Sequence, residues 1–323
     1  MDKILTIAIP TYNRENLLKR AIESIIPQMN EKVELLISDN ASTDGTEQLV
    51  KKYEGINYIR NVSNIGPDAN FLQCYTQSSG KYILLLGSDD ILLPDAIDSM
   101  LYALKDKEYS LVFINHGSFE NNNTQNLKYY IEPSQKVLST SSKKEFMEIA
   151  AYQLTYMSSF IMSKKLFERI DKPEKYNSTN FIHCCCAFES TKANEQQFGI
   201  IFSPCVGQDV TPNNAVISNK PGNIFFYFGE CMKKTYCEIA PQFGYSAKQM
   251  NHIFMQRVFS FWPKMIISFK AQYNRDDWER DFWKYGYKNI KEYPQTWIKI
   301  MPILIVPDSL IRILYTWYKK HKG

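Results

Sequence analysis

Two adjacent carboxylates directly follow a short apolar run. Tyr82 to Leu86 is a series of five apolar residues, and Ser88, Asp89 and Asp90 come just after it. A run without polar alternation predicts a strand buried on both faces, as in a parallel sheet covered by helices. Open α/β sheets bind ligands at the carboxyl ends of their strands, where carboxylates suit a hard divalent cation completed by phosphates. The pattern therefore predicts a site for a metal-bridged nucleotide diphosphate.

Two further polar segments follow predicted strands. Pro10 to Arg14 comes after the apolar run at residues 4–9, and Ser38 to Asn40 comes after the run at residues 33–37. The carboxyl ends of parallel strands share one edge of a sheet. We therefore expect these segments to lie beside Asp89 and Asp90.

Strand and helix patterns alternate along the first part of the chain. Strands are predicted at residues 4–9, 33–37, 56–59, 82–86 and 111–115, and helices at residues 14–28, 47–50 and 68–77. After a polar segment at 120–128, the pattern predicts a helix at 143–152, a strand at 158–162 and helices from about residue 225. The expected fold class is α/β, with a mostly parallel, Rossmann-like sheet, helices on both faces and a largely helical C-terminal region. The expected parts are residues 1–118, 119–223 and 224–323.

Composition and charge narrow the class of protein. The chain has 323 residues, 44% apolar and 22% charged, which is typical of a globular protein with a sizeable core. Its seven cysteines lack CxxC spacing, and no secretory signal is visible, so we expect reduced thiols and a cytoplasmic location. From residue 246 onward the sequence has 14 Lys and Arg but only 6 Asp and Glu. This basic, aromatic segment suggests an anionic partner surface.

Several spaced motifs resemble family 2 glycosyltransferases of the GT-A fold. The opening signature is Ile7 to Arg14, followed at matching distances by Ile37 to Thr46, Asn61 to Gly66 and Gly80 to Tyr82. Residues 68–72 and 86–90 are similar to the abequosyltransferase-like group of bacterial polysaccharide enzymes. The resemblance covers about residues 1–115, and agreement of several motifs in order is a strong signal.

The resemblance implies a nucleotide-sugar donor held across the sheet edge, most simply a UDP-sugar, with CDP- and dTDP-sugars as alternatives. Residues 1–118 would bind this donor and residues 119–223 the acceptor. Asp39 resembles the family carboxylate that accepts the N–H of the base. Asn64 would hold a loop, and Gly66 would let the backbone approach the donor. The other implied donor-binding residues are Pro10, Thr11, Tyr12, Arg14, Asp68 and Ser88. Tyr12 and Asn64 also fit plain structural roles, as a cover for the sheet and a turn residue.

The acidic motif departs from the family pattern of Asp-x-Asp. Gly87 stands at the first Asp position, while Asp89 takes the place of the metal-binding second Asp. The resemblance implies Mn²⁺ or Mg²⁺ as cofactor, with weaker metal affinity because one carboxylate is missing. The opposing reading is that Asp89 and Asp90 only cap a turn.

The catalytic base is harder to identify. Direct displacement at a sugar carbon needs a base within hydrogen-bond reach of the acceptor hydroxyl. The Glu-Asp motif that supplies it in many relatives is not found in this sequence. His183 and Asp90 are the predicted catalytic residues, because histidine titrates near neutrality and Asp90 adjoins the metal position. A lone histidine beside apolar residues is more often structural, and this reading of His183 stays open. Glu189 and Asp209 are weaker candidates.

The C-terminal region favours a membrane surface over nucleic acid. Its Lys and Arg alternate with Trp and Ile, and no nucleic-acid-binding motif is present. Tryptophans next to basic residues suit a membrane interface, although each could equally fill a helical core. The longest uncharged stretch near the end, residues 300–307, is too short to span a bilayer. We expect peripheral contact with the inner face of the cytoplasmic membrane, where a lipid-linked saccharide acceptor would lie.

The preferred function is transfer of a sugar from a metal-bound nucleotide donor to a saccharide in bacterial surface polysaccharide synthesis. The family resemblance implies inversion at the anomeric carbon. One alternative is a nucleotidyltransferase acting on sugar phosphates. It would need a glycine-rich loop after the first strand, and Pro10 to Arg14 contains no glycine. A second alternative is a non-catalytic scaffold of glycosyltransferase shape, which Gly87 and the missing Glu-Asp motif leave open. The donor sugar, linkage and oligomeric state are not readable from the sequence.

Overall fold

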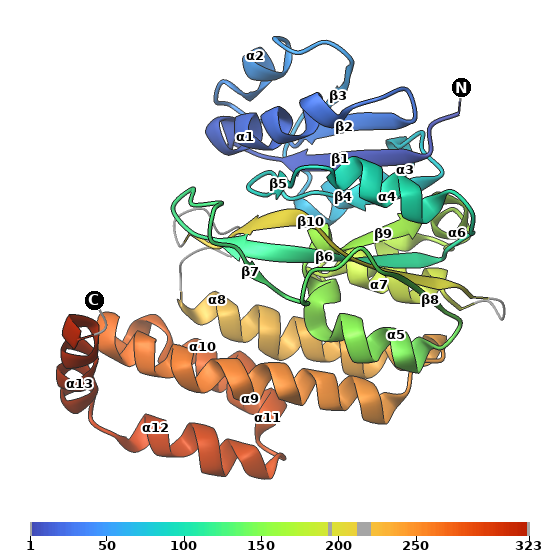
Figure 1. Ribbon diagram of the computed structural model, residues 1–323. Helices are drawn as coiled ribbons and strands as arrows, with labels where there is room; N and C mark the ends of the chain where they lie inside the picture. The colour runs from blue at the N-terminus through green and yellow to red at the C-terminus, as the bar shows by residue number, and fades with distance from the viewer. Residues whose placement is uncertain (1, 193–195, 212–220, 322–323) are drawn as a thin grey trace. The chain divides into compact units, whose positions relative to one another are not determined.

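The computed structural model describes residues 2–192, 196–211 and 221–321. It divides the chain into two compact units, Met1–Ala215 and Val216–Gly323. The first unit carries a sheet and the second is built from helices (Figure 1). The predicted roles of residues 1–118 in donor binding and of residues 119–223 in acceptor binding stay predictions.

The described part of the first unit contains ten strands in one sheet. Its main order is β3-β2-β1-β4-β9-β6-β10-β5, with β7 paired to β6 and β8 to β10. The strands are β1 (Leu5–Thr11), β2 (Val33–Asp39), β3 (Ile56–Arg60), β4 (Tyr82–Leu85), β5 (Ile91–Leu92), β6 (Leu111–Phe119), β7 (Lys128–Tyr129), β8 (Val137–Thr140), β9 (Phe160–Ser163) and β10 (Phe198–Asp209).

The longest pairings of this sheet are parallel. Strands β1, β2, β3 and β4 run in one direction, and β6 runs parallel to β10. Every residue of β1 and β4 is buried, as expected for strands covered on both faces. Strand β9 lies antiparallel between β4 and β6, so the sheet is mixed at this point. The predicted α/β class with a mostly parallel sheet is confirmed.

Helices pack on the sheet through apolar faces. In α1 (Glu15–Ile25) the buried residues are Leu18, Ala21, Ile22 and Ile25, the spacing of one helical face. They share a core with Ile97 and Met100 of α4 (Ala96–Leu104) and with alternate residues of the central strands. The other α-helices of this unit are α2 (Thr46–Val50), α3 (Pro67–Gln77), α5 (Lys143–Ala150), α6 (Lys164–Phe167) and α7 (Ile182–Ser190).

Two local expectations were incomplete. Strand β1 does not end before Pro10 but continues to Thr11, because Pro10 pairs in parallel register with Ser38. Strand β10 falls in a stretch for which no regular element was predicted. It is bulged where it passes Pro204, and this interruption hides its strand pattern.

The described part of the second unit, residues 221–321, is helical throughout. Its α-helices are α8 (Pro221–Phe225), α9 (Ala247–Gln272), α10 (Glu279–Asp281), α11 (Lys288–Ile290), α12 (Met301–Ile305) and α13 (Asp308–His321), several of them extended by π-helical turns. Ser246 caps α9 by accepting the N–H of Gln249 at 3.3 Å. The core is aromatic: the Phe225 ring lies edge-on to Trp262, with ring centres 5.2 Å apart. The predicted helical C-terminal region is therefore confirmed.

The five tryptophans of the second unit divide into two groups. Trp262 and Trp278 are buried in the aromatic core, whereas Trp283, Trp297 and Trp317 are 41%, 54% and 61% exposed. Core packing is therefore confirmed for Trp262 and Trp278, and the membrane interface stays a prediction for the three exposed tryptophans. No helix in the described ranges is long and apolar enough to cross a membrane.

Candidate active site

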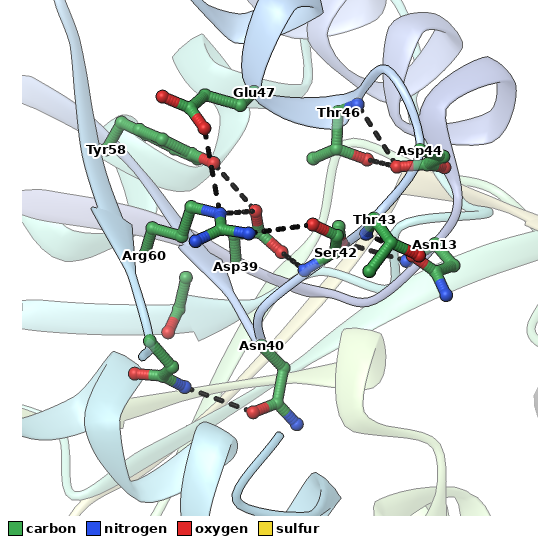
Figure 2. Close-up of polar contacts among 12 residues, drawn as sticks. Asn13, Asp39, Asn40, Ser42, Thr43, Asp44, Thr46, Glu47, Tyr58 and Arg60 are labelled. Carbon is green, nitrogen blue, oxygen red and sulfur yellow. Dashed lines mark hydrogen bonds and ion pairs between the residues drawn. The ribbon is translucent and has the colours of Figure 1, made fainter. Parts of the chain in front are cut away.

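Asp39 lies at the end of β2 inside a network of polar side chains (Figure 2). Its Oδ1 accepts the backbone N–H of Ser42 at 2.9 Å, and its Oδ2 accepts the hydroxyl of Tyr58 at 2.7 Å. Arg60 Nε lies 3.6 Å from Asp39 Oδ2 and 3.7 Å from Glu47 Oε2. Burial and the bond to Asp39 raise the pKa of Tyr58, so its hydroxyl stays a donor. Two carboxylate oxygens offer about four lone pairs, so these contacts do not exhaust the acceptor capacity of Asp39, whose side chain is fully buried in this structure.

The loop after β1 is tied to the loop after β2. Pro10 and Thr11 are buried at the end of β1, and Tyr12 beyond them is 44% exposed. Asn13 has a left-handed φ of 52°, and its backbone N–H donates to Ser42 Oγ at 2.9 Å. Figure 2 shows this tie beside the Asp39 network. The arrangement places Tyr12 in an accessible loop next to the predicted base pocket, and the contacts of these residues with a donor stay predictions.

A cluster of amides holds the loop that leads into α3. Asn40 Nδ2 donates to Asn64 Oδ1 at 2.9 Å, and Asn40 Oδ1 accepts from Asn61 Nδ2 at 3.1 Å. Asn64 Oδ1 also accepts the N–H of Gly66 at 2.9 Å. Gly66 has φ of 84°, a conformation that side chains other than glycine rarely adopt. These contacts agree with a loop-holding role for Asn64.

Asp68 stands in the first turn of α3 and connects two parts of the first unit. Its Oδ2 accepts the backbone N–H of Asn180 at 3.1 Å, just before α7. Burial raises the pKa of Asp68. The observed contact anchors the segment before α7, and donor binding by Asp68 stays a prediction.

Two arginines from α1 and the loop before it hold the acidic end of β4. Arg14 Nη1 lies 3.1 Å from Asp89 Oδ2. Arg20 Nη2 donates to the backbone carbonyl of Asp89 at 3.1 Å and to Asp209 Oδ2 at 2.8 Å. Arg20 also contacts the side chain of Asn122. Burial raises the pKa of Asp89 while Arg14 opposes that rise. The predicted metal residue is thus held next to a second carboxylate, Asp209.

Asp90 is also buried at this end of the sheet. Its Oδ2 accepts the hydroxyl of Ser158 at 2.6 Å, and its Oδ1 accepts the backbone N–H of Asp209 at 3.3 Å. Burial, followed by repulsion from Asp89, raises the pKa of Asp90 to about 8. Gly87 lies against it: a Cβ at position 87 would stand 2.6 Å from Asp90 Oδ2. We call Asp89, Asp90 and Asp209 the acidic cluster. Ser88, between Gly87 and Asp89, is buried beside it.

The remaining candidates for a base lie in other surroundings. His183 is 3% exposed and packs against three phenylalanine rings, with Nε2 3.1 Å from the carbonyl of Thr155. Burial lowers its pKa to about 4. Glu189 accepts the hydroxyl of Tyr176 at 2.7 Å and pairs with Lys175 at 2.7 Å. Both sets of contacts are those of structural residues, whereas Asp209 joins the acidic cluster.

Arg20, Tyr58 and Arg60 were not predicted as site residues. Arg20 lies on a helix whose spacing signals only its apolar face. Tyr58 and Arg60 are two apart on β3, so they point to the same face of the sheet, and Arg60 pairs in register with Asp39. The sequence did hold one signal for them: Tyr58 and Arg60 are alternate residues of a strand predicted next to the one that ends in Asp39.

The acidic cluster offers oxygen ligands suited to a hard cation, but it does not supply a complete coordination shell. Carboxylate oxygens suit Mg²⁺ or Mn²⁺, which commonly keep waters and substrate phosphates as further ligands. In the described ranges no group of three or more His, Cys, Asp or Glu residues is arranged to hold a metal by itself. The residues therefore fit a metal only as partners of a phosphate-bearing ligand.

The sequence is similar to curated bacterial glycosyltransferases. Abequosyltransferase RfbV of Salmonella typhimurium is 30% identical over 196 residues, which cover 56% of this chain and 59% of the relative. A GalNAc(5)-diNAcBac-PP-undecaprenol beta-1,3-glucosyltransferase of Campylobacter jejuni is 34% identical over 102 residues, 30% of this chain and 33% of the relative. The chain thus spans less than two thirds of the length of these two relatives.

Solved structures share the fold at low identity. The TarS 1–349 structure from S. aureus in complex with UDP has a TM-score of 0.61 and 16% identity, covering 98% of this chain and 87% of that chain. Mannosyltransferase PcManGT from Pyrobaculum calidifontis, in complex with GDP-Man and Mn²⁺, has a TM-score of 0.52 and 13% identity, with 96% and 86% covered. The model of the family described as glycosyl transferase family 2 matches residues 6–197. The chain belongs to glycosyl transferase family 2.

Proposed function

We propose that this protein transfers a sugar from a nucleotide-diphosphate donor to a saccharide acceptor in bacterial surface polysaccharide synthesis. The observation that carries the proposal is the acidic cluster at the carboxyl edge of the sheet. Asp89 pairs with Arg14 there, and Asp209 pairs with Arg20. Family membership and the likeness to RfbV support the same reaction class.

The donor is proposed to be a UDP-sugar, with CDP- and dTDP-sugars as alternatives. Asp39 would accept the N–H of the base, while Tyr58 and Arg60 fix its carboxylate from the strand beside it. Support for UDP comes from the fold neighbour TarS, whose structures contain UDP and UDP-GlcNAc. Pro10, Thr11, Tyr12, Asn64, Gly66, Asp68 and Ser88 complete the proposed donor-binding set.

The diphosphate would lie against the acidic cluster. Asp89 is the proposed ligand of Mn²⁺ or Mg²⁺, with the donor phosphates as the other ligands. Such an ion neutralises negative charge on the leaving diphosphate. Arg14 now neutralises Asp89, so it would exchange that partner for a phosphate when the donor binds. Arg20 keeps the Asp89 backbone in place throughout.

We propose inversion at the anomeric carbon through one direct displacement. The acceptor hydroxyl attacks that carbon, its proton passes to a base, and the nucleotide diphosphate leaves with the bonding electron pair. Asp90 is the preferred base, because it lies in the acidic cluster and His183 lies among phenylalanine rings. The acceptor is proposed to be lipid-linked, as the undecaprenol in the printed name of the Campylobacter jejuni relative suggests. Peripheral contact with the inner face of the cytoplasmic membrane would bring the protein to it.

Thermal stabilisation by nucleotides tests the donor site. The full chain would be melted with UDP, GDP, CDP or dTDP, each with and without Mn²⁺. A ligand at 100 times its dissociation constant adds about 2.7 kcal/mol to the free energy of unfolding. We expect one diphosphate to raise the melting temperature in a way that needs Mn²⁺ and is lost in Asp89→Asn. Asp98→Asn, an exposed carboxylate of α4, is the matched control. No shift with any nucleotide would favour a non-catalytic scaffold.

The base is tested separately by turnover. With the matching sugar donor, Asp90→Asn should lower kcat by about 100-fold or more, while nucleotide binding persists. His183→Gln should leave kcat within about threefold. The reverse pattern would return the role of base to His183.

A further inference from the structure

The last helix of the chain presents an apolar face to solvent. Leu310, Ile313, Leu314 and Trp317 of α13 recur at the spacing of one helical face, and they are 47%, 66%, 57% and 61% exposed. Ile311 on another side of the helix is 7% exposed. The helix is therefore amphipathic with a second apolar face directed outward. We call these four exposed residues the α13 face.

Hydrogen bonds and an ion pair fix α13 to the rest of the second unit. None of these contacts involves the four residues of the α13 face. Lys270 of α9 is 1% exposed and lies 2.9 Å from Asp308 Oδ1 at the start of α13. Its Nζ also donates to the carbonyls of Leu304 and Val306, at 2.9 and 2.7 Å, in the turn before the helix. Arg312 Nη2 donates to the carbonyl of Tyr273 at 3.3 Å. The α13 face is thus held in a set orientation within the second unit.

Charge distinguishes the possible occupants of this face. From residue 288 onward the sequence has seven Lys and Arg against two Asp and Glu. Lys299, Arg312 and Lys320 among them are exposed. A second copy of this chain would bring the same positive charge and be repelled. A helix of 14 residues is also only about 21 Å long and 10 Å wide, a small area beside the roughly 800 Å² per partner of a stable interface.

We propose that the α13 face is a docking surface for an anionic lipid bilayer. The apolar side chains would enter the boundary between headgroups and acyl chains, with the helix axis parallel to the membrane, and the neighbouring cations would attract anionic headgroups. Trp317 is suited to this depth, since its ring is apolar and its N–H can stay hydrated. The proposal deepens the proposed function by giving the membrane contact a surface, but binding can be measured without donor or acceptor.

Vesicle co-sedimentation of the full chain tests the proposal. The probes are phosphatidylcholine vesicles with and without about 30% phosphatidylglycerol, at low and at physiological salt. We expect binding to the anionic vesicles, weakened by salt. The double variant Leu314→Gln with Trp317→Gln should lower the partition coefficient at least tenfold, and Lys320→Glu should lower it severalfold. Tyr102→Gln, a 63% exposed aromatic on α4, is the matched control and should bind as the unaltered protein does.

Two results would overturn the proposal. One is that the double variant binds the anionic vesicles no more weakly than the unaltered protein does, which includes the case in which neither protein binds them. The other is a dimer, seen by light scattering, that the double variant dissociates. An unaltered circular dichroism spectrum and melting curve of the double variant show that it is folded. If vesicles bind and no nucleotide does, the docking surface stands while the proposed enzymatic function fails.

Discussion

The carboxylate of Asp90 occupies the space that a side chain at position 87 would need. An added Cβ on Gly87 would lie 2.6 Å from Asp90 Oδ2 and 3.0 Å from Asp89 Oδ1. Asp90 cannot move aside cheaply, because it is buried and accepts the Ser158 hydroxyl at 2.6 Å. The glycine in the acidic motif and the buried second carboxylate therefore belong to one local arrangement.

Restoring the usual carboxylate at position 87 should damage this arrangement. We expect Gly87→Asp to lower the free energy of unfolding by about 1–3 kcal/mol, because it overpacks the end of β4 and adds a third neighbouring charge. Denaturant unfolding measures the loss. The variant Gly87→Asp with Asp90→Gly should recover part of it, since the space is vacated. Additive losses in the double variant would show that the two positions are not coupled.

Arg20 should contribute more to the free energy of unfolding than Lys19, the neighbouring cation on α1. Arg20→Gln removes the Arg20 cation from Asp209, whose side chain is fully buried. Since the Arg20 side chain is 26% exposed, water offsets part of this cost, and we expect a loss of about 1–3 kcal/mol. Lys19→Gln removes an exposed pair with Glu23 and should cost no more than about 0.5 kcal/mol. Asp209→Asn should partly rescue Arg20→Gln, and equal losses for Arg20 and Lys19 would contradict this account.

The sequence predicted what depends on local pattern. Apolar runs located the strand that ends in Asp39 and the strand that precedes Asp89, because a strand buried on both faces is typically a continuous apolar run. Arg20 escaped prediction, since its partners Asp89 and Asp209 lie far along the chain and no spacing in α1 signals them. The surroundings of His183 were equally hidden. Two of its three phenylalanine neighbours, Phe71 of α3 and Phe160 of β9, lie far from it along the chain and meet it only in the folded unit.

The hydroxyl of Tyr58 should affect nucleotide affinity through Asp39. Tyr58→Phe removes the donor that fixes Asp39 Oδ2 at 2.7 Å, and a bond to a charged group is typically worth about 1.5–3 kcal/mol. We expect the dissociation constant of the diphosphate to rise about tenfold, measured by calorimetry. Tyr53→Phe loses a weaker, exposed contact with Glu23 at 3.4 Å and should leave affinity unchanged. Unaltered binding by Tyr58→Phe would remove this tyrosine from the donor site.

Lys270 should be essential for the end of the second unit. Lys270→Met leaves the carbonyls of Leu304 and Val306, and the carboxylate of Asp308, without their shared donor. We expect a loss of about 2–4 kcal/mol in the unfolding of this unit and faster proteolysis near α13. Lys264→Met, at an exposed position of the same helix, is the control. Similar protease resistance of both variants would show that Lys270 does not hold α13.

Burial of His183 should make stability depend on pH. Its pKa is lowered to about 4 in the folded chain from an unfolded value of 6.5, so the unfolded state binds more protons between these values. The contribution of this histidine is therefore complete above pH 6.5 and is lost as pH falls toward 4, by about 1.4 kcal/mol per pH unit at most. The stability difference between the unaltered protein and His183→Gln should shrink accordingly in urea unfolding from pH 7.5 to 4.5. A constant difference for His183 would mean that folding leaves its pKa unchanged, which would contradict this account.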